Sequence, residues 1–205
     1  MMLGLLATSA MAQDVVVAAF GDSLTAGFGL PPEDGFVPQL SRWLKDEGVA
    51  AQIINAGVSG DTTAGGLSRL EWTLTPEVDA LIVALGGNDL LRGVDPDISR
   101  ANLSGILEIA AARDLPVLLV GLDAPSNYGA DFEARFEGMY ADLSDEYDTA
   151  LYPNFLEGIA RTGDLRSALR LYMQRDGIHP NADGVALMVE DIGPAVRDLI
   201  DTARD

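Results

Sequence analysis

The sequence predicts a single doubly wound α/β domain, in which helices cover both faces of a parallel five-stranded sheet. Its 205 residues suit one α/β domain and are too few for two of full size. Five short runs rich in Val, Ile and Leu alternate along the chain with longer segments of helical period. Because strands that alternate with helices usually pair in parallel, this order indicates a three-layer α/β/α architecture.

The predicted strands are apolar on both faces, as expected where helices cover a parallel sheet on both sides. They are Val15–Phe20, Ala51–Asn55, Ala80–Leu85, Val117–Leu122 and Ala150–Tyr152. The predicted helices follow them in alternation and carry an apolar stripe with most charged residues off it. They are Phe36–Glu47, Thr63–Leu74, Ile98–Arg113, Phe132–Tyr147 and Ala182–Ile200. No linker or internal repeat appears, so one domain is expected over residues 13–205.

The charge balance and the absence of cysteine exclude several classes of function. The chain has 13 basic and 32 acidic residues, a net charge of −19, which disfavours binding to nucleic acids and to anionic lipid by charge alone. No stretch approaches the roughly 18 apolar residues that span a bilayer, so we expect no stable membrane insertion. Without cysteine there are no disulfides, thiol nucleophiles or thiolate metal sites. The chain has one histidine, His179.

The first twelve residues resemble the end of a secretory signal peptide. An apolar run precedes Ala10-Met11-Ala12, which fits a small-x-small cleavage site before Gln13. The run is short and no Lys or Arg precedes it, as in a partial signal. We therefore expect a periplasmic or secreted protein.

Glycine-rich polar turns follow the predicted strands, at the edge where open parallel sheets bind ligands. They are Gly21–Ser23, Gly57–Thr62, Gly86–Asp89 and Asp123–Gly129, with Asp176–Pro180 reached after a longer excursion. Residues 90–95 and 123–129 are candidates for a loop that closes over a ligand, because of their positions after predicted strands. Such clustering predicts a site built from several strand ends.

Ser23, Asp176 and His179 have the residue types of a catalytic triad. A serine hydroxyl needs a base, and the single histidine is the one imidazole available. Asp176 precedes it by three residues in the same turn, where a carboxylate can orient the ring. Alone, each motif is more typical of a structural role: a helix cap for Ser23, a solvated loop for Asp176 and His179. Taken together, they indicate nucleophilic catalysis.

Two residues are candidates for binding an oxyanion beside Ser23. Gly60 has no side chain to keep its backbone N–H from a substrate, and Asn88 carries a side-chain amide. A turn glycine and an Asx-turn are the alternatives, and either is the commoner role for such a residue taken singly. The G-x-S-x-G elbow of α/β-hydrolases is absent, since Thr25 occupies its last position, so a different fold is expected.

Four blocks, in this order and spacing, resemble the SGNH/GDSL hydrolases: Gly21–Leu24, Ser59–Thr62, Gly86–Asp89 and Asp176–Pro180. The resemblance covers nearly the whole chain after Gln13 and implies a flavodoxin-like topology with no metal or cofactor. It implies Ser23 as nucleophile, Asp176 as orienting acid and His179 as base. It also implies that the oxyanion donors are the Ser23 and Gly60 backbones and the Asn88 amide.

The segment SGDTTAGGLSRL and the Asn-Tyr-Gly at 127–129 look most like the bacterial periplasmic arylesterase, thioesterase and lysophospholipase subgroup. The resemblance implies hydrolysis of short to medium acyl esters, such as aryl esters, acyl thioesters or lysophospholipids, through an acyl-Ser23 intermediate. Further residues in or beside the blocks are expected to contact the substrate: Asp22, Asp61, Leu90, Pro125, Asn127, Tyr128 and Ile178.

Three alternatives remain at this point. The same triad would serve a carbohydrate O-acetyl esterase, although two tryptophans, Trp43 and Trp72, offer little surface for stacking sugars. The carboxylates of Asp22, Asp61 and Asp89 would converge in a metal-dependent phosphatase, although Asx-type backbone bonds are their usual role. A non-catalytic binding module is the third alternative, disfavoured by the complete set of triad residue types.

Overall fold

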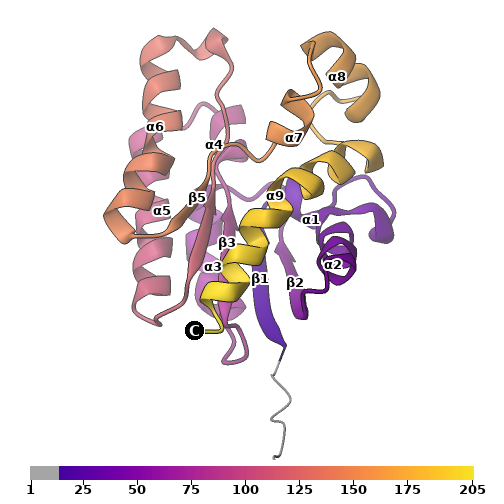
Figure 1. Ribbon diagram of the computed structural model, residues 1–205. Coiled ribbons are helices and arrows are strands. Elements are labelled where there is room, and N and C mark those ends of the chain that lie inside the picture. The colour runs from indigo at the N-terminus through magenta and orange to yellow at the C-terminus, as the bar shows by residue number, and fades with distance from the viewer. Residues whose placement is uncertain (1–13) are drawn as a thin grey trace, which may run out of the picture.

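The sheet has five parallel strands in the order β2-β1-β3-β4-β5 (Figure 1), seen in a computed structural model that describes residues 14–205. The strands are β1 (Val15–Gly21), β2 (Ala51–Gly57), β3 (Ala80–Ala84), β4 (Val117–Val120) and β5 (Ala150–Tyr152). This is the flavodoxin-like order, and the predicted fold class is confirmed. The predicted signal segment, residues 1–12, lies outside the described residues.

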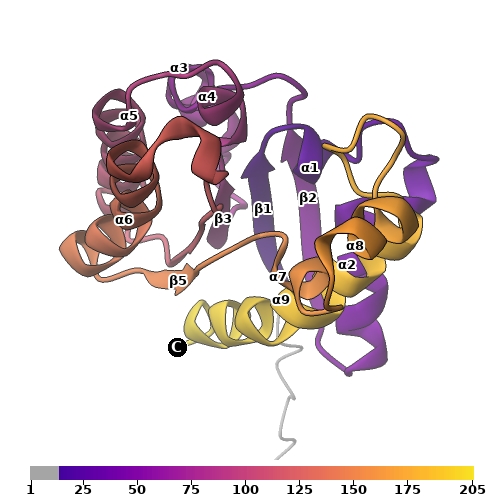
Figure 2. The same cartoon turned by 90° about the horizontal axis from the view of Figure 1, so that it is seen from above.

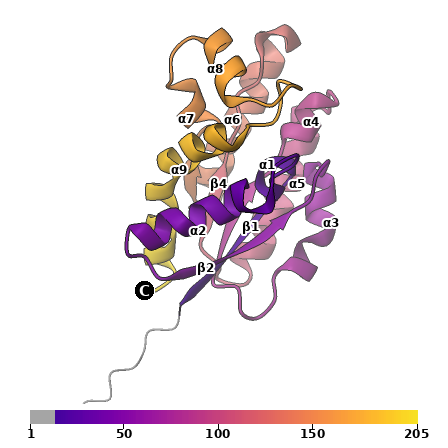
Figure 3. The same ribbon diagram turned by 90° about the vertical axis from the view of Figure 1, so that its right-hand side faces the viewer.

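Two layers of helices cover the sheet, as the views along and across the strands show (Figures 2 and 3). One face packs against α2 (Phe36–Asp46) and α9 (Ala182–Thr202), while α7 (Glu157–Ala160) and α8 (Leu165–Tyr172) pack on α9. The other packs against α3 (Thr63–Thr73), α5 (Pro96–Ala111) and α6 (Ala130–Tyr147). Two short helices, α1 (Ser23–Ala26) and α4 (Gly87–Leu91), follow β1 and β3 directly. Within the described range, no helix is both long and apolar enough to cross a membrane.

Alternate side chains of each strand enter opposite cores, which explains why the strands read as continuous apolar runs. In β1, Val17 and Ala19 join the core beneath α2 and α9, whereas Ala18 and Phe20 join the core beneath α3, α5 and α6. All four are fully buried. The two cores hold the sheet rigidly, so its carboxyl edge is a fixed base for the loops that follow the strands.

The strand boundaries depart from the predicted ones at the ends of β2, which continues to Gly57, and of β4, which stops at Val120. Beyond β4, the Gly121 N–H donates to Tyr152 at the end of β5, and the Gly121 carbonyl accepts from Phe155 on the connection that follows. Helices α1, α4, α7 and α8 were not predicted as elements. Each is shorter than nine residues, too short for a helical period to stand out.

Candidate active site

Ser23 lies at the first position of α1, immediately beyond the carboxyl end of β1. Asp22 caps the helix by accepting the backbone N–H of Leu24 at 3.0 Å. Gly57 in β2 allows α1 to pack closely, since a Cβ at that position would lie 2.8 Å from the Ala26 Cα. The hydroxyl is therefore held by a tight strand-to-helix turn, at the N-terminus of a helix.

The structure brings Ser23, His179 and Asp176 into one hydrogen-bonded chain across 156 residues of sequence. The His179 Nε2 lies 2.9 Å from the Ser23 Oγ, and its Nδ1 lies 2.7 Å from the Asp176 Oδ2. With Nδ1 protonated toward the carboxylate, Nε2 is free to accept the serine proton. These contacts have the geometry required of a nucleophile, a base and an orienting acid.

The Asp176 carboxylate is held in its ionised form by the turn that carries it. Backbone N–H donation from His179, the His179 ring and the N–H of Ile178 lower the pKa of Asp176 to about 2. Gly177 adopts a φ of +68° between these residues, which allows the chain to curl around the carboxylate. An ionised Asp176 favours the tautomer that leaves Nε2 unprotonated.

Gln174 ties the histidine turn to the serine segment, a role that the sequence did not suggest. Its side-chain amide donates to the backbone oxygens of Phe28 at 2.8 Å and Pro180 at 2.9 Å. Its backbone N–H donates to the His179 oxygen at 2.7 Å. The Phe28 ring also packs on the imidazole, with 4.6 Å between centroids. These contacts fix the imidazole over Ser23.

Gly60 and Asn88, the expected oxyanion donors, lie on loops that a single arginine joins. Gly60 has a φ of +86°, a conformation that side chains disfavour, and its carbonyl accepts from Arg92 at 2.7 Å. Arg92 caps α4, the helix that carries Asn88. In the described part of the chain, the backbone N–H groups of Ser23 and Gly60 donate to no protein acceptor. They are therefore available to a ligand.

Asp22 is buried, where the sequence led us to expect a substrate contact. Only 3% of the residue is exposed, and its Oδ2 accepts the Asn88 side-chain amide at 3.2 Å. Burial raises the pKa of Asp22 to about 6. The carboxylate instead orients Asn88, because it lies at the base of the α1 turn, under the expected oxyanion donors.

Asp61 forms an ion pair where a substrate contact was expected. Its Oδ2 lies 2.5 Å from the Arg69 Nε, and Arg69 also donates to the Gly21 oxygen at 3.0 Å. The Arg69 guanidinium stacks on the Phe20 ring, 4.1 Å from its centroid. Arg69 thus joins the Gly60 loop to the nucleophile turn, a role with no signature in the sequence.

The three carboxylates of the metal-dependent alternative do not form a common site. Asp89 is buried and accepts from the Thr63 N–H and hydroxyl, at 2.8 and 2.6 Å, and from Ser99. Asp22 and Asp61 face Asn88 and Arg69. Across residues 14–205, no group of three acidic or histidine side chains is arranged to hold a metal ion. Asp89 instead joins α3, α4 and α5 beneath Asn88.

The remaining predicted substrate contacts have mixed positions. Leu90 is only 8% exposed and belongs to the core, because α4 turns it inward and leaves Leu91 outside, so that expectation is wrong. Ile178 is exposed beside His179, as expected of a contact residue. Pro125 is exposed and precedes the short helix η2 (Ser126–Tyr128). Within that helix, Asn127 is exposed and Tyr128 stacks on Phe132. Among the described contacts, none joins these three to the triad.

The family model of the GDSL-like Lipase/Acylhydrolase family matches residues 19–187, which include all four sequence blocks. The chain belongs to this family. That membership confirms the resemblance found in the sequence. The chain is an enzyme of the esterase class, as the motifs predict.

Two curated relatives of this GDSL-like chain are similar over nearly its whole length. Esterase TesA of Pseudomonas aeruginosa is 39% identical over 199 residues, 97% of this chain and 94% of its own. Thioesterase 1/protease 1/lysophospholipase L1 of Escherichia coli K12 is 32% identical over 97% of this chain and 90% of its own. The crystal structure of AlinE4, a SGNH-hydrolase family esterase, is 45% identical with a TM-score of 0.74, covering 92% of this chain and 98% of its own.

Proposed function

We propose that Ser23 is the nucleophile of an acyl-transfer reaction to water, with His179 as base and Asp176 as orienting acid. As the Ser23 oxygen attacks the carbonyl carbon, His179 Nε2 takes the hydroxyl proton. The imidazolium then gives that proton to the leaving oxygen or sulfur, and the acyl group stays on Ser23. Water, deprotonated by His179, attacks the acyl carbon, and Ser23 regains its proton as the acid leaves. The observation that supports this role is the 2.9 Å contact between Ser23 and His179.

The negative charge of each tetrahedral intermediate would be stabilised by three donors: the N–H groups of Ser23 and Gly60 and the side-chain amide of Asn88. The two N–H groups have no protein acceptor in the described residues, and the Asn88 amide has a second hydrogen beyond the one given to Asp22. Their positions follow from rigid elements: α1, the Arg92-anchored turn and α4. Such fixed donors typically contribute about 10²–10³ each to the rate.

The substrates are short to medium acyl esters, with aryl esters, acyl thioesters and lysophospholipids as the leading candidates. Four exposed apolar side chains lie near site residues in the sequence: Phe28 after α1, Val58 before Gly60, Leu91 at the end of α4 and Ile178 beside His179. These side chains are suited to contact an acyl chain. The names of the E. coli and P. aeruginosa relatives also indicate ester and thioester bonds.

A carbohydrate ester is less well supported by the arrangement of aromatic residues. Trp43 is packed between α2 and α9, where a Cβ at Gly193 would lie 2.7 Å from its ring. Trp72 is exposed, but it lies at the end of α3 opposite to the one that begins near Gly60. Neither tryptophan is placed to stack a sugar against Ser23.

A periplasmic or secreted location remains part of the proposal. Its support is the apolar run and the small-x-small pattern at Ala10–Ala12. Cell fractionation tests this location. The full chain should be found in the periplasm or the medium, and a chain without residues 1–12 should stay in the cytoplasm.

The test of the reaction is hydrolysis of a p-nitrophenyl ester by the Ser23→Ala variant. We expect kcat to fall by at least about 10⁴-fold while the thermal unfolding midpoint is retained. Retention of most of the activity would exclude Ser23 as the nucleophile. Two treatments of the wild-type protein separate this function from metal-dependent hydrolysis. Activity should survive EDTA and should be lost after a serine-directed fluorophosphonate.

A further inference from the structure

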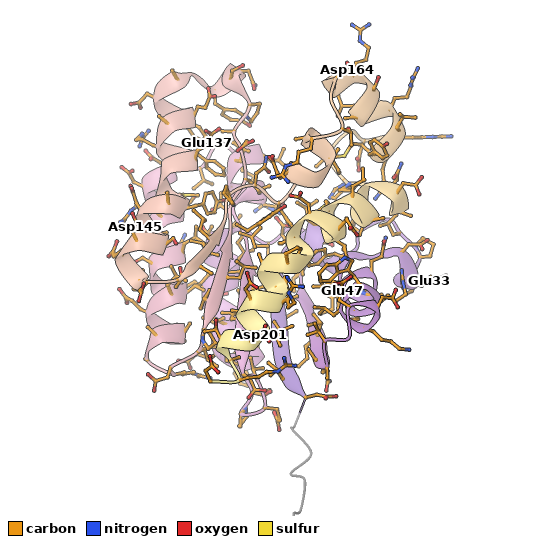
Figure 4. The ribbon with its side chains drawn as sticks, in the orientation of Figure 1. Glu33, Glu47, Glu137, Asp145, Asp164 and Asp201 are labelled. Carbon is orange, nitrogen blue, oxygen red and sulfur yellow. The ribbon has the colours of Figure 1, made fainter. Side chains whose placement is uncertain are left out.

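A groove lined by three arginines lies beside the catalytic turn of this acidic protein. Acidic side chains are spread over several separate helices, as Glu33, Glu137, Asp145 and Asp201 show (Figure 4). In contrast, three of the 13 basic residues, Arg166, Arg170 and Arg175, line one groove. We call this the α8 groove, and its other lining residues are Asp164, Leu169, Met173, Gln174 and Gly177. It is a local positive site on a chain of net charge −19.

The three arginines carry charge that the protein does not neutralise. Among the described residues, none of them forms an ion pair, whereas the nearby Arg161 forms two, with Glu157 and Asp191. Asp164 is the one carboxylate lining the groove, and it is engaged by the N–H groups of Arg166 and Ser167 at the start of α8. Three guanidinium groups that share one concave surface favour an anionic ligand.

The α8 groove has the size and mixed polarity of a small-molecule site. Its volume is about 860 Å³, within the usual range for ligand sites. Leu169 and Met173 contribute apolar surface between the arginines, and Leu169 is 42% exposed. An open groove with both characters fits a molecule that has an anionic group on an apolar or mixed backbone.

The groove shares a wall with the histidine turn. Gln174 and Gly177 line it, and both belong to the turn that holds Asp176 and His179. Because His179 must protonate the leaving atom, the leaving group of a substrate lies on the His179 side of Ser23. A leaving group that extends past the imidazole would therefore point toward the wall formed by Gln174 and Gly177.

We propose that the α8 groove binds a phosphate group carried by the leaving alcohol or thiol of the substrate. Arg166, Arg170 and Arg175 would donate charge-assisted hydrogen bonds to the phosphate oxygens. Leu169 and Met173 would contact the linker between phosphate and ester. This proposal rests on the proposed esterase function and narrows its substrate class to phosphate-bearing acyl esters and thioesters.

The test compares three substrates of equal acyl length: octanoyl-CoA, an octanoyl lysophosphatidylglycerol kept below its micelle concentration, and the uncharged p-nitrophenyl octanoate. The variant is Arg166→Gln/Arg170→Gln, which leaves the histidine turn unchanged. The control is Arg100→Gln/Arg197→Gln, which removes the same charge from two arginines that do not line the groove. Thermal unfolding checks that each variant is folded, and the single substitutions serve if the double variant is not.

We expect the groove variant to raise KM about 10-fold or more for at least one phosphate-bearing substrate. Its kcat should stay within about 2-fold, and hydrolysis of the p-nitrophenyl ester should not change; the control should behave as wild type. An effect on octanoyl-CoA alone would place the phosphate on a leaving thiol, and one on the lysolipid alone would place it on a leaving glycerol. A salt dependence of KM that weakens in the variant would also support the site.

Equal KM values for wild type and variant with both phosphate-bearing substrates would overturn the proposal. So would loss of binding to anionic phosphatidylglycerol vesicles with unchanged KM for the monomeric substrates, since that result indicates a membrane surface. Hydrolysis of p-nitrophenyl octanoate that depends on Ser23 would leave the esterase function standing in either case. Its absence in wild type would instead refute the esterase proposal itself.

Discussion

The side-chain amide of Asn88 donates to the buried carboxylate of Asp22 across 3.2 Å. This contact links the N-cap of the helix that carries Ser23 to the helix that carries an expected oxyanion donor. The same carboxylate accepts the Leu24 N–H at 3.0 Å, so one side chain sets both positions. A buried carboxylate is costly to retain, which is consistent with a role in positioning Asn88.

Replacement of Asp22 by Asn should lower kcat with little change in KM. Leu24 and Asn88 donate to different oxygens of the carboxylate, Oδ1 and Oδ2, and an amide replaces one of these oxygens by an NH₂ group, which cannot accept. We expect p-nitrophenyl ester hydrolysis to fall by about 10–100-fold as the Asn88 amide loses its orientation. The control is Asp79→Asn, which removes a carboxylate that accepts the Val16 N–H at the opposite edge of the sheet. Equal activities of the two variants would contradict the positioning role.

The raised pKa of Asp22 predicts a pH dependence of stability. The value in the folded protein is about 6, above its ordinary 3.8, so the folded state binds the proton more tightly. The contribution to the free energy of unfolding is therefore full below pH about 4 and is lost as pH rises through about 6, by up to about 3 kcal/mol. Urea unfolding from pH 4 to 7 should show this loss in wild type relative to Asp22→Asn. Parallel stability curves would refute it.

Gln174→Leu should impair catalysis more than folding. It removes both amide donations that join the serine segment to the histidine turn, so the imidazole should sample other positions. We expect kcat to fall about 10–100-fold. Gln39→Leu is the matched control, because Gln39 also donates to two backbone oxygens, those of Asp34 and Ala182, away from the triad. The role is supported if both variants lose similar thermal stability but only Gln174→Leu loses kcat. Equal kcat values for the two variants would contradict it.

Asp176→Asn should reduce kcat by about 10⁴-fold while the protein stays folded. The amide favours the histidine tautomer that protonates Nε2, which then cannot take the Ser23 proton. Because the pKa of Asp176 is about 2, its ionisation contributes to stability above its ordinary value of 3.8 and is lost as pH falls through about 2. Any decline of wild-type activity between pH 4 and 7 should therefore come from other groups. A titration of Asp176 in that range, followed by NMR, would contradict this assignment.

The sequence predicted the strands well because four of the five expected ranges are almost entirely apolar, and Ala150–Tyr152 matches β5 residue for residue. It left out α8, whose eight residues are too few for a helical period to stand out. The missed residues of the site act over long range: Gln174 reaches Phe28 across 146 residues, and Arg69 reaches Gly21 across 48. No local pattern encodes such contacts.

The motif residues themselves were predictable because each carries a chemical requirement that few residue types meet. A lone histidine with an aspartate three residues before it left one arrangement for a triad, and the distances agree with it. The expectations for Asp22 and Leu90 were wrong for a different reason. Proximity to a motif does not tell which side of a short turn or helix faces the core, and both side chains face inward.

The central claim is that the Ser23 hydroxyl is activated by His179. Peptide mapping by mass spectrometry after treatment with a fluorophosphonate tests it most directly, because the reagent bonds to an activated serine and not to an ordinary one. We predict one adduct, on the peptide that contains Ser23, formed rapidly in wild type and slowly in His179→Ala. An adduct on another serine, or labelling of Ser23 at the same rate without His179, would contradict the account.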